Sequence, residues 1–187
     1  QKLPYENSRI AYRAIGRSVD SRTMIATLLP PRTFAGHSLN VSVGINDSNN
    51  LLYLLSIFNS FTLDFVLRQR VSANLTLYYL LQLPVPRLSE KDLAFRPIVT
   101  RAARLICTTP EFDDLAKEVG LKSHKDGAKD ALERGKLRAE LDGLIAHLYG
   151  LTEEEFAYIL TTFPLVPDPV KIAAQNAFRN VEKGLIK

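Results

Sequence analysis

Side chains able to hydrogen-bond to the edges of DNA bases gather in two predicted loops near the amino terminus. They are Arg17, Asp20, Arg22, Arg32, Thr33, His37 and Ser38. The fork of an arginine matches O6 and N7 of guanine, and a carboxylate accepts a hydrogen bond from N4 of cytosine. The two loops therefore predict direct readout of the major groove. Asp20 and Ser21 are equally well explained as residues whose side chains bond to the backbone of their own turn.

A further polar cluster follows the longest apolar segment of the chain. It consists of Arg68, Arg70, Ser72 and Asn74. These side chains could contact DNA phosphates, which position a protein on the duplex without carrying sequence information. The arginines could equally mark the carboxyl end of a helix, where cations stabilise exposed carbonyl groups. Tyr78 and Tyr79 come next, and we expect them to pack against other side chains instead of stacking on bases.

The charge of the chain is unevenly distributed along it. Residues 1–87 hold nine basic residues, eight of them arginine, against four acidic ones, a balance of +5. Residues 88–187 hold fifteen basic and sixteen acidic residues, a balance of −1. Arginine suits both guanine edges and phosphates because its fork is planar. The bias towards arginine therefore favours a nucleic-acid partner, although host codon usage can produce the same bias.

The composition is that of an ordinary folded domain, with 46% apolar and 24% charged residues. The chain starts at Gln1 and its one methionine is Met24, so we expect a fragment of a longer polypeptide. The one cysteine, Cys107, has apolar neighbours and is expected in the core. Without a signal-peptide pattern, a cytoplasmic location is expected. Residues 51–67 are apolar but interrupted by polar side chains, which favours a buried helix over a membrane span.

The segments that flank these loops predict an α+β fold. Residues 9–17, 23–29 and 39–43 have the composition and alternation of strands, and residues 50–69 form a helix that is apolar on more than one face. We therefore expect a small mixed sheet wrapped on a buried helix, forming a basic lobe over residues 1–88.

Residues 89–187 are predicted to form a helical extension. Helices are expected from Pro97 to about residue 108, from Thr109-Pro110 to Gly120, and from Asp168 towards Gly184. Leucine and isoleucine at helical spacing over residues 137–148 predict an amphipathic helix. Thr152 and Glu155 have the spacing of a capping box.

Residues 74–90 connect the two parts in a distinctive way. A polar turn leads into an apolar stretch, and Pro84 and Pro86 then exclude a helix before a charged segment begins. With the apolar residues 50–70 before it and residues 140–156 after it, this pattern resembles the target recognition domains of bacterial restriction-modification enzymes. The family meant is that of adenine-specific methyltransferases of type IIG and of type I specificity subunits. The likeness covers about residues 9–163.

The resemblance implies a DNA recognition domain that is not catalytic by itself. Its partners would be double-stranded DNA and the methyltransferase domain of the same polypeptide, and that domain would bind S-adenosylmethionine and flip the adenine. The Asn/Asp-Pro-Pro-aromatic motif of such enzymes is missing, because Pro30-Pro31 lacks both flanking residue types. We therefore expect no catalytic residue, cofactor or metal site in this chain. The alternative is a protein–protein assembly module that docks through residues 89–187, and an independent enzyme is the third interpretation.

Overall fold

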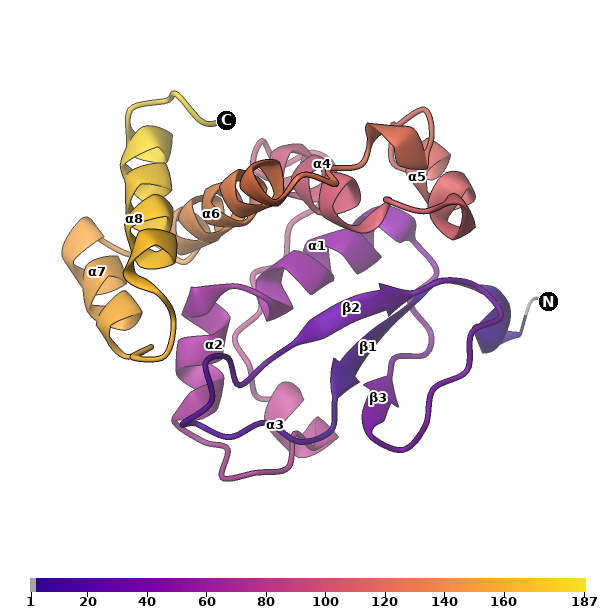
Figure 1. The fold of residues 1–187 in the computed structure, drawn as a ribbon, viewed down its shortest axis with the longest axis horizontal. Coiled ribbons are helices and arrows are strands. Elements are labelled where there is room, and N and C mark those ends of the chain that lie inside the picture. The colour runs from indigo at the N-terminus through magenta and orange to yellow at the C-terminus, as the bar shows by residue number, and fades with distance from the viewer. Residues whose placement is uncertain (1–2) are drawn as a thin grey trace.

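The computed structural model describes residues 3–187. A three-stranded sheet forms one layer, the central helix pair α1 and α2 lies against it, and the later helices cover the other side of that pair (Figure 1). This arrangement confirms the predicted α+β class. It follows from the two-sided apolar character of the central helices, which are buried between the sheet and the helical layer.

The sheet consists of β1 (Arg9–Arg13), β2 (Ala26–Leu29) and β3 (Leu39–Val41) in the order β2-β1-β3. Arg9 lies opposite Leu29 and Ala11 lies opposite Val41, and both pairings are antiparallel, so the sheet is not mixed as predicted. The strands are also shorter than predicted. Residues 14–16 leave β3 for a different partner. Thr23 does not pair with the backbone of β1, because its N–H donates to Asp64 on α2 and its carbonyl accepts from the side chain of Arg13.

The predicted helix over residues 50–69 is two helices, α1 (Ser48–Phe58) and α2 (Phe61–Arg68), with a bend of 60° between them. Two polar side chains explain the break. Ser60 caps α2 by accepting a hydrogen bond from Leu63 N at 3.2 Å. Asn59 turns to β2, where its amide accepts from Ala26 N at 3.1 Å and donates to Ala26 O at 3.0 Å. Asn59 therefore occupies the place that a neighbouring strand would take at this edge of the sheet.

After α2 the chain forms the short helix α3 (Leu77–Leu80) and then the Pro84-x-Pro86 segment. This segment is neither helix nor part of the sheet. Its carbonyl groups are held by two tyrosines, because Tyr149 donates to Pro84 O at 2.7 Å and Tyr53 donates to Pro86 O at 2.8 Å. The connection thus lies between the central helix and the carboxyl-terminal half.

The remaining helices are α4 (Phe95–Ile106), α5 (Asp113–Glu118), α6 (Ala131–Leu148), α7 (Glu153–Thr161) and α8 (Asp168–Glu182). Short 3₁₀ turns cover Pro4–Glu6, Pro110–Phe112 and His124–Asp126. The capping box is confirmed: Thr152 Oγ1 accepts from Glu155 N at 3.2 Å, and Thr152 N donates to the Glu155 carboxylate at 2.8 Å. Gly120 has a φ of +91°, which allows it to end the α5 segment as predicted.

One main hydrophobic core extends from Ile10 in β1 to Ile145 in α6, so it continues across the predicted boundary at residue 88. A smaller cluster joins Phe61 to α7 and α8 through Phe163 and Phe178. Cys107 is fully buried, as predicted. Among residues 3–187 no single helix combines the length and apolar character of a membrane span. The bent pair α1 and α2 has that length and composition only when the two helices are counted together.

Candidate nucleic-acid interface

Three of the predicted polar segments meet at one end of the sheet. Beyond β1, Ala14 N donates to Ser38 O at 2.8 Å, which holds the start of β3. Ala14 O then accepts from Leu75 N at 2.9 Å, and Gly16 N donates to Ala73 O at 2.8 Å. Ile15 forms a bridge with Asn74. The exposed residues His37 and Ser38 and the exposed polar turn with Ser72 and Asn74 are therefore brought together with the loop that begins at Arg17.

Within the β1–β2 loop, Arg17 and Asp20 have different environments. Asp20 accepts from Arg17 N at 3.1 Å and pairs with Arg13 at 3.0 Å. The backbone N–H of Arg17 and the neighbouring guanidinium groups lower the pKa of this carboxyl. Asp20 is thus committed to its own turn, the alternative left open above. The Arg17 side chain is 64% exposed and has only a 3.4 Å contact with Asp20, so it remains accessible to a ligand.

Arg22 does not project from this loop. Its Nε donates to the buried carboxylate of Asp64 at 2.8 Å, its Nη2 donates to Asn59 O, and its guanidinium lies 4.3 Å from the centre of the Phe61 ring. Asp64 also accepts from Thr23 N at 3.0 Å. These contacts connect the β1–β2 loop to the break between α1 and α2. The structure therefore corrects the predicted guanine contact of Arg22 to a role inside the protein.

Arg68 is also an internal residue and not a phosphate ligand. It is 6% exposed. Its guanidinium donates to Thr162 O at 2.7 Å and to Asp20 O at 2.8 Å, and it stacks 3.9 Å from the centre of the Phe163 ring. Burial lowers the pKa of this group. Arg68 thus ties the β1–β2 loop to the end of α7, a contact that sequence spacing alone does not reveal. The alternative interpretation, in which Arg68 marks the carboxyl end of a helix, agrees with its position as the last residue of α2.

Arg32 and Thr33 lie at the opposite end of the sheet from Arg17, because they follow β2 where it pairs with the start of β1. Arg32 N donates to Tyr5 O at 2.6 Å, and Thr33 O accepts from Arg9. Arg32 has a φ of +61° and an exposed side chain. Arg32 and Thr33, at the start of the second predicted loop, are therefore separated from Arg17 by the length of β1. The second loop reaches the end of the sheet where Arg17 lies only at His37 and Ser38.

Arg70 lies just after α2 and is exposed, in contrast to Arg68 two residues earlier. Its guanidinium donates to Gln82 O at 3.2 Å and has no acidic partner within ion-pair distance among residues 3–187. Tyr78 and Tyr79 were expected to pack against other side chains, and they pack edge-on against each other. Tyr79 is half-buried, but Tyr78 is 70% exposed and so does not lie in the core. Arg70 and Arg17 are the cations best placed at this end of the sheet.

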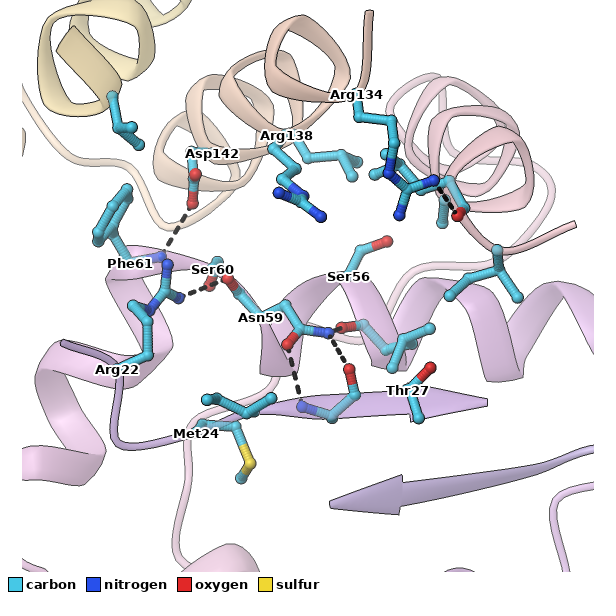
Figure 2. A pocket seen from close by; sticks show the side chains of 18 residues that line it. Arg22, Met24, Thr27, Ser56, Asn59, Ser60, Phe61, Arg134, Arg138 and Asp142 are labelled. Carbon is cyan, nitrogen blue, oxygen red and sulfur yellow. Dashed lines mark hydrogen bonds between the residues drawn. The ribbon is translucent and has the colours of Figure 1, made fainter. Parts of the chain in front are cut away.

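Sequence reasoning missed a cavity of about 460 Å³ between β2 and the helical layer. Figure 2 shows Arg22 and Asn59 on one side of it and Arg134, Arg138 and Asp142 of α6 on the other. Asp142 accepts from Phe61 N at 2.9 Å, and complete burial raises the pKa of its carboxyl to about 6. No residue spacing indicated this site, since its walls come from segments more than 100 positions apart.

Groups that could support catalysis are sparse in the part of the chain that the structure describes. Burial raises the pKa of the Cys107 thiol to about 12, so the thiol is protonated at neutral pH. Residues 3–187 contain no cluster of three or more histidine, cysteine, aspartate or glutamate residues that could hold a metal ion.

No family model matches the chain, and neither the curated proteins nor the solved structures include a significant match to it.

Proposed function

We propose that this chain is the DNA target recognition domain of a restriction-modification adenine methyltransferase, and that it carries no catalytic activity of its own. The observation that supports this most is the convergence of three polar segments at one end of the sheet. Their accessible side chains are Arg17, His37, Ser38, Arg70, Ser72 and Asn74.

These side chains are of the types that contact DNA. Arg17 and Asn74 can bond to guanine and adenine edges respectively. Arg70 can hold a phosphate and so fix the register of the protein on the duplex. They project from rigid neighbours, because Ala14, Gly16 and Leu75 hold the loops through backbone hydrogen bonds. Specific readout needs such support, since a side chain that is free to wander cannot discriminate between bases.

Duplex DNA and a methyltransferase domain of the same polypeptide are the partners in this proposal. S-adenosylmethionine would be bound by that domain, and a cytoplasmic location belongs to the same proposal. Arg22 and Arg68 are left out of the DNA-contacting set because their hydrogen bonds are internal. Arg32 and Thr33 would contact DNA only if the duplex also passes the other end of β1.

A selection experiment tests this function. The 187-residue chain is mixed at low salt with a pool of duplexes that carry a randomised segment, and the bound fraction is sequenced. An enriched motif is expected. Arg17→Ala and Asn74→Ala should each relax the preference at one position, because a bidentate base contact discriminates by about 1–3 kcal/mol. Lys125→Ala, an exposed change in the helical half, is the matched control and should leave the motif unchanged.

If the wild-type pool shows no enrichment, the chain does not recognise sequence, and the assembly-module alternative gains. If the motif survives both loop variants, DNA is recognised by another surface, and the assignment of these residues is wrong.

A further inference from the structure

The cavity described above has an apolar wall and a basic wall. Leu55 of α1, Ala102 and Leu105 of α4 and Leu141 of α6 supply the apolar side. Arg134 and Arg138 lie one turn apart on α6, and both line the cavity. None of the side chains proposed to contact DNA lines this cavity, so it is separate from that interface.

The two arginines have no acidic partner within the described residues 3–187. Arg134 donates to Leu105 O and to Ala128 O, both at 2.8 Å, and so is held by carbonyl groups alone. The Arg138 side chain is exposed and forms no hydrogen bond or ion pair with another described residue, and Figure 2 shows its guanidinium extending from α6 towards Ser56. Burial lowers the pKa of Arg134, and the charge of Arg138 lowers it further, which indicates that the two cations repel each other.

The other charged groups that face this space do not neutralise the pair. Arg22 is neutralised by Asp64. Asp142 is the one carboxyl among the lining residues. One of its oxygens accepts from Phe61 N at 2.9 Å, and although it attracts Arg138, its single charge cannot balance both arginines. An excess of positive charge therefore remains beside an apolar wall. An anion would balance this charge, and the planar fork of arginine binds carboxylate and phosphate groups well.

We propose that this cavity binds a small organic anion. Its phosphate or carboxylate group would lie between Arg134 and Arg138, and its apolar body would lie against Leu55, Leu105 and Leu141. The volume of about 460 Å³ is within the range of roughly 300–1,000 Å³ that small-molecule pockets occupy. Such a ligand would bridge the sheet lobe and α6, and so would stabilise the contact between the two halves of the chain.

The test uses the 187-residue chain and three probes: phenyl phosphate, benzoate and inorganic phosphate. Binding is followed by the shifts of backbone amide signals in NMR titrations. At least one aromatic anion should saturate with a dissociation constant of about 1 mM or tighter, and inorganic phosphate should bind about tenfold more weakly because it lacks the apolar body. Comparison of phenyl phosphate with benzoate distinguishes a phosphate from a carboxylate ligand. Equal affinity for inorganic phosphate, or no saturable binding of either aromatic anion, would overturn the proposal.

Three variants localise the binding. Arg138→Gln should weaken it about tenfold or more, because a charge-assisted hydrogen bond is lost. Lys136→Gln removes a charge from the same helix at a side chain that is 76% exposed and outside the cavity, and it should change affinity less than about twofold. Thr27→Phe fills the cavity from β2 without a change of charge and should abolish binding. Equal weakening by Arg138→Gln and Lys136→Gln, or full affinity in Thr27→Phe, would place the ligand elsewhere.

Discussion

Arginine has two different roles in the amino-terminal half of this chain, and the contacts separate them. Arg22 and Arg68 are held against aromatic rings by hydrogen bonds to Asp64 and to backbone carbonyls. Arg17 and Arg70 extend outwards. Because the internal pair already has partners in the fold, of these four arginines only Arg17 and Arg70 are free to bind a new anion. The +5 balance of residues 1–87 therefore overstates the charge available to DNA.

The first prediction concerns Arg68. Arg68→Ala should lower the free energy of unfolding by about 2–4 kcal/mol, because it leaves Thr162 O and Asp20 O without their charged donor. Arg70→Ala, two residues away but exposed, is the matched control and should change it by less than about 0.5 kcal/mol. Urea denaturation measures both. Equal effects of the two substitutions would contradict the internal role of Arg68.

The second prediction concerns Asp142, whose pKa is raised by burial from an ordinary 3.8 to about 6. With a folded pKa above the unfolded one, its stabilising contribution is complete below pH 3.8 and is lost as pH rises through about 6. Asp142→Asn keeps an acceptor for Phe61 N but cannot ionise. The stability of the variant relative to wild type should therefore increase by about 2 kcal/mol between pH 4 and pH 7.

The measurement is urea denaturation of both proteins at several pH values. Carboxyls whose pKa is lowered, such as Asp20 and Asp113, also make stability depend on pH. Their contribution cancels in the difference between the two proteins, because both proteins contain them. A difference that does not change with pH would show that Asp142 is not a buried acid.

At the scale of helices, the contact between α6 and α8 depends on a glycine. A Cβ at Gly143 would lie 2.7 Å from Phe178 N and 2.8 Å from the carbonyl carbon of Ala177, which is too close to a rigid backbone. The two helices can therefore approach closely only without a side chain there. His147 from the next turn of α6 stacks on Phe178 with 3.9 Å between ring centres, which fixes the same contact.

The third prediction follows from this contact. Gly143→Ala should destabilise the protein by about 1–3 kcal/mol, because α8 must move away. Gly135→Ala on the same helix has open space around the new methyl group and should stabilise it by up to about 1 kcal/mol through better helix propensity. In thermal unfolding, the midpoint temperature should fall for Gly143→Ala and rise for Gly135→Ala. Two shifts of the same sign would exclude this close packing.

Local signals in the sequence predicted most of the elements but not their ends or their contacts. The capping box at Thr152 and the turn at Gly120 depend on a few neighbouring residues, and both are confirmed. The break at Asn59 was missed because it depends on Ala26, which lies 33 positions earlier in the chain. Polar residues at 59 and 60 inside an apolar run were the one available signal.

The same limit applies to the candidate site. The exposure of Arg17 and Asn74 agrees with their loop composition, which is a local property. The internal partners of Arg22 and Arg68 come from positions 42 and 94 residues away, at Asp64 and Thr162. Residue types alone cannot show whether an arginine meets a distant carboxylate or remains free, since that depends on tertiary packing.

At the scale of the whole molecule, the basic lobe and the helical extension share one core. Leu52 and Ile57 of α1 lie in the same hydrophobic cluster as Ile98 of α4 and Ile145 of α6. The predicted boundary at residue 88 therefore divides a basic part of the sequence from a nearly neutral one, but it does not divide the hydrophobic core. A recognition surface on one half would be held rigidly relative to helices on the other.

The fourth prediction is that the purified chain transfers no methyl group to DNA. The motif for the target base is missing from the sequence, so no transfer from labelled S-adenosylmethionine to a duplex should exceed that of a protein-free reaction. A catalytically active adenine methyltransferase serves as the positive control. Incorporation above background that grows with protein concentration would contradict a purely recognitional role.

The most direct measurement of the central claim is the salt dependence of duplex DNA binding, followed by fluorescence anisotropy. If two to four exposed arginines hold phosphates, log K should fall with log salt with a slope of roughly −2 to −4. The double variant Arg17→Gln/Arg70→Gln should reduce that slope by about two, whereas Lys125→Gln should not change it. No binding at low salt, an affinity independent of salt, or equal slopes for the double variant and wild type would contradict DNA recognition at this end of the sheet.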